Sequence, residues 1–295
     1  NAKSTFTGSL PAAPQSGSMN GAIGSMIPLG RPEGMKFYEN IDNKDSQGLV
    51  GANYDQAIAL MANQDDYRYN VISVPGLIKA NAAQGSQITT LVNNCVSRGD
   101  AMAIVDLVNY NTAINTVTVQ AAGFDSSYAA TYWPWVRVVD ANTSELVYVP
   151  ASTVIPGVYA FTDSTSDPWF APAGITRGGL SVVNAERRLT VGNRDTLYEA
   201  NVNPIATFPG QGVVVFGQKT LQKKASALDR VNVRRLLIAL KNFIGQVADT
   251  LVFDQNTIIT RNNFLSQVNP YLESVQQRQG LFAFKVVMDD SNNTP

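Results

Sequence analysis

The sequence predicts a mixed α/β fold, an α+β arrangement in which a layered sheet carries flanking helices. Two apolar runs, Tyr69 to Val74 and Ala101 to Val108, have the length and composition of buried strands. Each run follows a segment whose apolar residues recur at helical spacing. Helix, strand, helix, strand in close succession is typical of parallel strands joined by right-handed crossovers.

The elements of the N-terminal half follow from local patterns. The two helical segments are Tyr54 to Ala62 and Ser86 to Val96, and the Pro-Gly pair at 75–76 favours a turn that ends the first strand. We expect residues 128–140 to feed a third strand from the end of a helix. Residues 150–161 are expected to form a helix over the sheet.

The C-terminal third carries the clearest helical pattern. Val213 to Gly217 predicts a short buried strand. Ser226 to Asp229 has the Ser-x-x-acid form of a capping box, which predicts the start of a long helix with an apolar stripe from Val233 to Leu251. A second helix is predicted over 263–278, where apolar residues recur every three or four positions.

A final strand is predicted over 281–288. Such a strand near a chain end leaves an edge with which another chain can pair, and its candidate pairing residues are Phe284, Val286 and Met288.

The composition excludes several classes of enzyme. The chain of 295 residues has no histidine, which removes histidine acid–base chemistry, Ser-His and Cys-His nucleophile pairs and nearly all zinc sites. The one cysteine, Cys95, lies in a predicted apolar helix stripe and is expected to be a buried thiol. The adjacent carboxylates at 65–66 and 289–290 lie in polar stretches and predict surface turns rather than an acid–base pair. We therefore predict no enzymatic activity, no metal site and no cofactor.

Charge divides unevenly along the chain. Residues 1–170 carry a net charge of −6, whereas residues 171–295 carry +5. Within residues 177–241, 11 basic residues face 4 acidic ones, which suits an acidic partner surface. Aromatic residues are not interleaved with these cations as single-stranded nucleic acid binding would require, so we expect no direct contact with nucleic acid. No apolar run approaches the roughly 20 residues that span a bilayer, so no membrane insertion is expected.

The long helix concentrates the candidate contact residues. Residues 230–248 contain no acidic side chain, so charge compensation must come from other segments or from another molecule. The expected arrangement places its cations on the solvated side of the helix. The contact candidates are Arg194, Arg230, Arg234, Arg235 and Lys241.

Several blocks in the C-terminal half resemble the tail sheath proteins of contractile bacteriophage tails. The blocks are Pro168 to Gly174 with Arg177-Gly178, Arg194-Asp195 to Asn203-Pro204, Gly212 to Thr220, Asp229 to Leu236, Thr260 to Phe264, Val286 to Asp289 and Asn292 to Pro295. Their order and spacing match the family, most clearly over 165–295 and more weakly over about 50–165.

The resemblance implies a structural subunit that polymerises as a helical cylinder around an inner tail tube and contracts to drive that tube through the host envelope. It implies as partners other copies of the chain, the tail tube protein, and baseplate and tail terminator proteins. It implies a place in the virion tail, after assembly in the host cytoplasm. In this family, terminal arms add strands to the sheets of neighbouring subunits.

The resemblance also implies a division of the chain into three parts. Residues 1–35 form a Gly/Pro/Ser-rich loop that leaves an outer domain, 36–165 form the α/β core, and 166–295 form a tube-proximal region without its C-terminal arm. Both chain ends are expected to be cuts. Two alternatives stay open: the sheath of a related injection system, such as a secretion system or a bacteriocin, and a virion hydrolase that depends on carboxylates alone.

Overall fold

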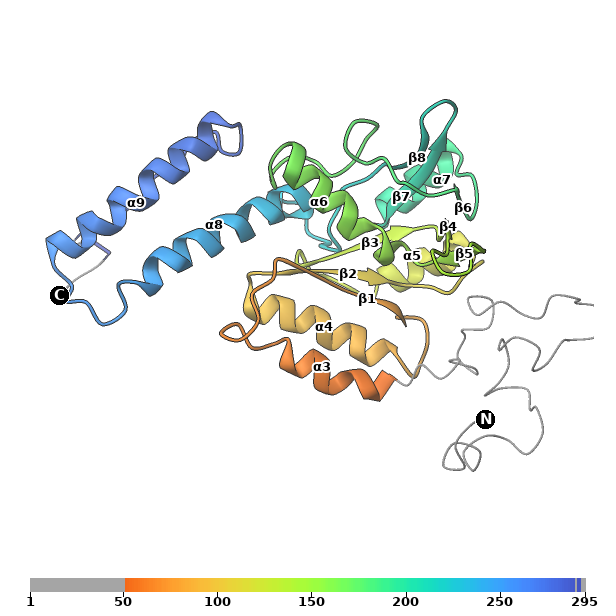
Figure 1. Cartoon of the computed structure of the whole chain (residues 1–295), viewed down its shortest axis with the longest axis horizontal. Coiled ribbons are helices and arrows are strands. Elements are labelled where there is room, and N and C mark those ends of the chain that lie inside the picture. Colours follow the sequence, from red (N-terminus) through yellow and green to blue (C-terminus); the bar gives the residue numbers. More distant parts are fainter. Residues whose placement is uncertain (1–50, 290, 293–295) are drawn as a thin grey trace, which may run out of the picture.

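A computed structural model describes residues 51–289 and 291–292 (Figure 1). The predicted loop at 1–35 lies outside these residues. In chain order the described elements are η1 (Gly51–Tyr54), α3 (Asp55–Leu60), β1 (Val71–Ile78), α4 (Gly85–Arg98), β2 (Met102–Asp106), α5 (Ile114–Ala121), β3 (Ala129–Trp133), β4 (Val136–Val139), β5 (Leu146–Val149), η2 (Ala151–Thr153), α6 (Ile155–Thr165), β6 (Asn184–Ala185), α7 (Val191–Glu199), β7 (Asn203–Phe208), β8 (Gly212–Val215), η3 (Ala227–Asp229), α8 (Val231–Asp249) and α9 (Ile258–Gln277).

The body of the described chain is built on a five-stranded sheet with the order β1-β2-β3-β7-β8. The strands β1, β2, β3 and β7 are parallel, and β8 pairs antiparallel with β7 through a short turn. The expected α/β fold with parallel strands is therefore confirmed. The sheet takes β7 and β8 from beyond residue 165, so the two regions proposed on either side of that residue share one sheet.

Helices cover both faces of the sheet. One core joins α3, α4, α5 and α7 to one face, and the other joins α6 and the first half of α8 to the opposite face (Figure 1). The central strand β2 shows how the sequence produces two cores. Ala103 and Val105 point into the first core, and Met102 and Ile104 into the second. Successive strand residues alternate between faces, so a strand covered on both sides must be apolar throughout.

A smaller antiparallel sheet, β5-β4-β6, adjoins the main sheet. It follows Pro134, where the chain leaves β3 and enters β4. Trp135 lies at this junction with 4% of its surface exposed, and its indole Nε1 donates to the carbonyl oxygen of Val108 at 3.0 Å. The expectation of a helix end before a single strand at 128–140 was therefore wrong. The aromatic side chains around this junction are buried in the core: Tyr132, Trp133 and Trp135 are each no more than 4% exposed.

Helices α8 and α9 form an arm that extends from the body (Figure 1). The first half of α8 packs on the sheet, and the second half continues outward, where α9 folds back along it. A third apolar cluster fills the hairpin, with Leu240 and Val247 of α8 facing Val268 and Leu272 of α9. Trp169 closes the cluster at the body end, and its Nε1 donates to the carbonyl oxygen of Arg278 at 2.9 Å.

Three local expectations differ from the structure. The pair at 75–76 does not end β1, because β1 is an edge strand and an edge tolerates Pro; the register shifts there instead. Ser226 does not cap the long helix. Its hydroxyl accepts a hydrogen bond from the Leu228 amide and opens the short turn η3, and α8 begins only at Val231. The predicted strand at 281–288 is considered with the contact surfaces below.

Candidate contact surfaces

The first half of α8 carries two consecutive arginines that are buried in the chain. Arg234 is 7% exposed and Arg235 is 4% exposed. The expectation that both lie on the solvated side of the helix is wrong. Their burial follows from the packing of α8, because the helix lies on the sheet and α6 covers one of its flanks (Figure 1).

Arg235 is compensated by another segment of the same chain. Its Nη2 lies 2.7 and 2.6 Å from the two carboxylate oxygens of Asp163 on α6, and its guanidinium carbon lies 4.5 Å from the centre of the Tyr159 ring. The Tyr159 hydroxyl in turn lies 2.7 Å from the hydroxyl of Tyr132 on β3. Burial raises the pKa of Tyr159 to about 12. Arg235 therefore sits at one end of a buried polar chain that links α8, α6 and the sheet.

Arg234 contacts a different segment of the body, the residues just before β3. Its guanidinium carbon lies 3.9 Å from the centre of the Tyr128 ring, and Nη2 donates to the Ser127 hydroxyl. Burial lowers the pKa of Arg234, but an arginine remains charged in proteins. A stacked and hydrogen-bonded guanidinium of this kind holds α8 against the start of β3.

Lys241 fixes α8 to a third segment. Its Nζ donates to the carbonyl oxygen of Arg98 at 2.7 Å, at the last turn of α4. The next residue, Gly99, has a φ of 68°, and a Cβ there would lie 2.6 Å from Lys241 Nζ. Gly99, in the left-handed conformation, thus ends α4 and leaves room for the Lys241 ammonium group. The position of this cation at the C-terminal end of α4 is stabilised by the helix dipole.

The remaining two candidates, Arg194 and Arg230, lie at the surface and contact aromatic rings. The Arg194 guanidinium carbon lies 5.2 Å from the centre of the Phe208 ring and 5.3 Å from that of Phe216. The Arg230 side chain, 39% exposed, pairs with Asp229 at 3.1 Å and donates to the Tyr198 hydroxyl. Both cations remain accessible from one side.

The exposed cations of the 177–241 stretch include three that were not among the candidates, namely Arg188, Lys223 and Lys224. None of them forms an ion pair with another residue of the described ranges. The sequence signal for them was present, because Lys223 and Lys224 lie in a polar run between two apolar elements. The helix face was a stronger pattern, and it favoured Arg234 and Arg235, which the structure buries.

Residues 281–288 form no strand within the described chain. Leu281, Phe284 and Val286 instead pack on the third cluster of the α8–α9 hairpin. The alternation of apolar residues predicted the buried side of the segment. It did not predict pairing, which needs a neighbouring strand that the described chain lacks here.

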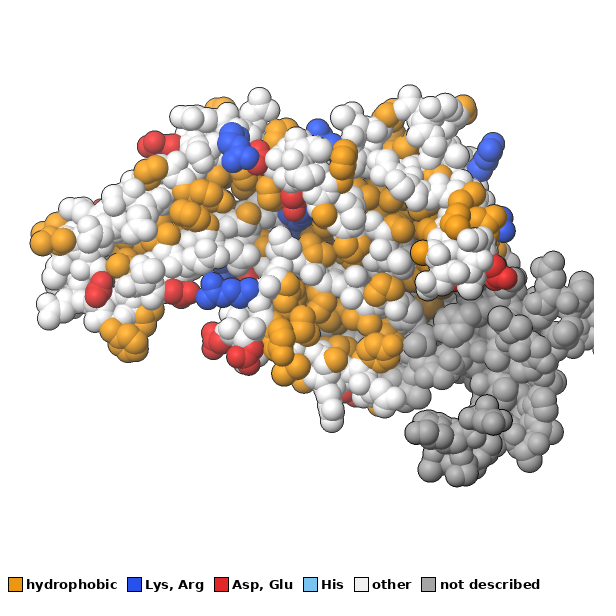
Figure 2. Space-filling model, viewed as in Figure 1, with side chains coloured by type: hydrophobic (Ala, Val, Ile, Leu, Met, Phe, Trp, Pro, Cys, Tyr) orange, Lys and Arg blue, Asp and Glu red, His pale blue; other side chains and the backbone are white. Residues whose placement is uncertain are grey.

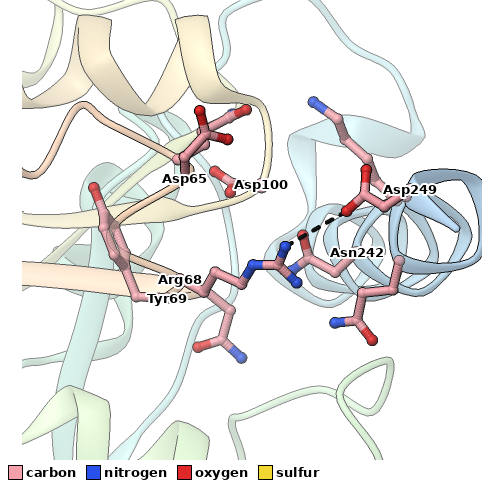
Figure 3. Close-up of a pocket in the computed structure, with 11 residues that line it drawn as sticks. Asp65, Arg68, Tyr69, Asp100, Asn242 and Asp249 are labelled. Atoms are coloured by element: carbon pink, nitrogen blue, oxygen red, sulfur yellow. Dashed lines mark hydrogen bonds and ion pairs between the residues drawn. The ribbon is translucent and has the colours of Figure 1, made fainter. Parts of the chain in front are cut away.

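A cleft of about 510 Å³ separates α8 from the loop before β1 (Figure 3). Asp65, Arg68 and Asp100 line the body side, and Asn242 and Asp249 line the helix side. Arg68 reaches across and pairs with Asp249 at 3.5 Å. Both side chains are about two thirds exposed, so this pair contributes roughly 1 kcal/mol at most.

The carboxylates do not form an acid–base pair in the described residues. Asp65 and Asp66 are exposed in a turn, and Asp290 lies outside the described residues. Asp106 is the most strongly perturbed acid: burial raises its pKa to about 7, and the hydroxyl and amide of Ser152 both donate to it. Cys95 is fully buried, as expected, and burial raises its pKa to about 12.

Among the described residues, no group of three or more His, Cys, Asp or Glu side chains lies close enough to hold a metal ion. No helix in the described ranges is long and apolar enough to cross a membrane.

Comparison with known proteins defines the class to which this arrangement belongs. Residues 48–221, more than half of the chain, match the family model of the phage tail sheath protein central domain. The chain therefore belongs to the phage tail sheath protein family. Sheath proteins are structural and not enzymatic, so the carboxylate hydrolase is set aside.

Particular relatives are tail sheath proteins of two phages. The chain is 36% identical to that of Vibrio phage KVP40 over 67% of its residues and 34% identical to that of Enterobacteria phage T4 over 65%. It spans only about 30% of the length of each of these relatives. The helical sheath of the anti-feeding prophage in its contracted state is similar in structure, with a TM-score of 0.60 and 25% identity. That match covers 80% of this chain and 62% of the other.

Proposed function

We propose that the chain is a structural subunit of a contractile phage tail sheath, which polymerises as a helical cylinder around the inner tail tube. Contraction of the cylinder drives the tube through the host envelope during genome delivery. The observation that carries this proposal is the family match over residues 48–221, and the likeness to a helical sheath in the contracted state supports it. The free energy that drives contraction comes from the difference in stability between two assembled conformations, so no nucleotide hydrolysis is needed.

The partners that follow are other copies of the chain, the tail tube protein, and the baseplate and tail terminator proteins. The subunit would be part of the virion tail after assembly in the host cytoplasm. It would make no direct contact with nucleic acid and would not insert into a membrane. In this account, residues 36–165 form the sheath core and residues 166–295 the tube-proximal region.

A sheath from a related injection machine is the second candidate. The identity of 34–36% to two phage sheaths, against 25% to the anti-feeding prophage sheath, favours a phage.

The tube contact is proposed to be electrostatic. Arg194, Arg230 and Lys241 keep accessible charge, and Lys223 and Lys224 add exposed cations without an ion pair among the described residues. Arg234 and Arg235 are withdrawn, because burying them within the chain leaves no surface for a partner. Exposed ion pairs are weak and screened by salt, so many of them can be broken together when subunits move outward.

The C-terminal segment is proposed to change partner on assembly. Phe284, Val286 and Met288 lie on a segment with no strand neighbour in the described chain, and extended backbone of this kind can add to the sheet edge of another subunit. Release from the hairpin would cost the apolar contacts of Phe284 and Val286, which the new ladder must offset.

Charge reversal tests the tube contact. In the double variant Lys223→Glu/Lys224→Glu, we expect sedimentation with purified tube to fall steeply at low salt, while the thermal unfolding midpoint stays unchanged. The double variant Lys223→Arg/Lys224→Arg, which keeps both positive charges at the same two positions, is the matched control. Sedimentation with tube that is the same for the double variant and the native chain would overturn the electrostatic contact.

A further inference from the structure

The distal end of the arm exposes four large apolar side chains. The loop after α8 exposes Val252 and Phe253, at 55% and 103% of their surface, and the first turn of α9 exposes Ile258 and Ile259, at 71% and 73%. We call these four side chains the tip patch. Figure 2 shows hydrophobic side chains protruding at this end of the molecule. Several large exposed apolar side chains at the end of a projecting element are typical of a contact site for another protein.

The loop holds Phe253 outward in a strained conformation. Its φ is 84°, in the left-handed region that a bulky aromatic residue rarely adopts. The loop is nevertheless tied down: the Thr257 hydroxyl accepts from the Thr260 amide at 3.2 Å, and the Thr260 hydroxyl donates to the Gln255 carbonyl oxygen at 2.8 Å. Nothing within the described chain packs on the ring to offset the strain. Strain kept at an exposed side chain is a feature of binding sites.

A groove of matching chemistry lies on the body. It runs between α6 and residues 175–182, has a volume of about 690 Å³, and is lined by apolar, hydroxyl and amide residues without a single charged side chain. We call it the α6 groove. Phe161 and Ile175 are about half exposed on it, and a Cβ at Gly157 would meet no atom within 4 Å, so the floor is open.

The tip patch and the α6 groove lie on different parts of the molecule. The tip patch ends the arm, and α6 lies on the body (Figure 1). We propose that the tip patch of one copy docks in the α6 groove of the next copy. Two different patches that fit each other give a head-to-tail contact, which produces rings or open helices rather than closed dimers. This inference rests on the proposed function, because a helical homopolymer requires two complementary surfaces on each copy.

The match in polarity favours a second copy as the occupant. The groove offers no cation or anion to recognise a charged partner, and the four tip side chains bring none. Docking would remove the exposed apolar surface of both patches at once. A contact of this kind is driven by apolar burial and should persist at high salt, unlike the proposed tube contact.

Mixed disulfide trapping tests the contact directly. One preparation carries Asp254→Cys beside the tip patch, and a second carries Ser181→Cys on the groove. The native Cys95 is fully buried and does not compete for the oxidant. We expect mild oxidation of the mixture to give a covalent heterodimer, at both low and high salt.

Matched variants separate the contact from random collision. Val119→Cys on α5 is also at an exposed position and lies on neither patch, so its mixture with Ser181→Cys should give little heterodimer. Adding Phe253→Ser to the tip preparation should lower the trapping yield about tenfold or more, since an aromatic anchor is lost. Gly157→Phe in the groove preparation should do the same by filling the groove.

The outcomes distinguish a failure of the docking contact from a failure of the proposed sheath function. Equal yields for Asp254→Cys and Val119→Cys would overturn the proposal, and so would self-linking of Asp254→Cys alone, which indicates a symmetric tip-to-tip contact. If electron microscopy shows hollow cylinders but no heterodimer is trapped, the sheath function is supported and the proposed contact is contradicted. Specific trapping without any cylinder under assembly conditions would leave the contact standing and contradict the sheath function.

Discussion

Arg234 and Arg235 are consecutive on α8 and bind two different parts of the body. Arg234 stacks on Tyr128 at the start of β3, while Arg235 pairs with Asp163 on α6. Lys241, two turns further along, reaches the end of α4. The two buried arginines thus fix α8 to its own body, and Lys241 adds a third attachment while its side chain stays exposed. The arm is therefore held at its root, and a force applied at its distal end would be transmitted to the sheet.

The first prediction concerns the Arg235 pair. Asp163→Ala leaves a buried guanidinium without its carboxylate, so the free energy of unfolding should fall by about 1–3 kcal/mol. Asp195→Ala removes an exposed carboxylate on α7 and should change it by less than about 0.5 kcal/mol. Urea unfolding measures both. Equal effects of the two substitutions would contradict a structural role for the pair.

Two neighbouring glycines give a matched steric test. A Cβ at Gly178 would lie 2.8 Å from the backbone oxygens of Gly174 and Val215, whereas a Cβ at Gly179 would meet no atom within 4 Å. Gly178→Ala should therefore destabilise by about 1–3 kcal/mol, because backbone atoms must move. Gly179→Ala should be close to neutral. Thermal unfolding of the two variants compares them, and a reversed order would show that residues 174–178 pack differently from the structure.

The raised pKa of the buried Asp106 should make the stability of the folded chain depend on pH. Its pKa is raised from an ordinary value of 3.8 to about 7 in the folded chain, so the folded state binds the proton more tightly than the unfolded state. Its contribution is fully present below pH 4 and is lost as pH rises towards 7, by on the order of 4 kcal/mol. Asp106→Asn stays neutral, so its stability relative to the native chain should rise between pH 4 and 7 and then level off. Urea titrations at several pH values measure this difference, and a difference independent of pH would rule out the raised pKa.

Cys95 should be unreactive in the folded chain. Its thiol is fully buried and burial raises its pKa to about 12, so almost no thiolate forms at neutral pH. A thiol reagent at pH 8 should label it only after unfolding, while an added Ser97→Cys, exposed on the same helix, should react at once. Rapid labelling of Cys95 in the native chain would mean that α4 opens locally.

The sequence predicted those parts of the fold in which one local pattern decides the structure. The apolar run of β2 and the helical stripes of α4 and α9 were of this kind. Burial on both faces gives a strand that is apolar throughout, and burial of one helix face gives apolar residues at helical spacing. The small sheet β5-β4-β6 and the short helices α5 and α7 were missed, since short polar-faced elements are stabilised by tertiary contacts rather than by their own pattern.

The contact candidates could be predicted only in part. The absence of acidic residues over 230–248 correctly indicated compensation from another segment, but the sequence did not show that Asp163 of α6 would supply it. The period of a helix gives the face on which Arg235 lies. It does not say that a second element covers that face. The exposed pair Lys223 and Lys224 was overlooked for the same reason, because loop exposure follows from the fold around it.

Electron microscopy of the full polypeptide that the gene encodes, purified alone and with the tail tube protein, tests whether this chain is a sheath subunit. We expect hollow helical cylinders of uniform diameter that form around the tube. The same polypeptide should lose tube-dependent assembly on Lys223→Glu/Lys224→Glu substitution. Particles that remain monomeric under every condition, with and without tube, would contradict the assignment of this chain as a subunit of a contractile sheath.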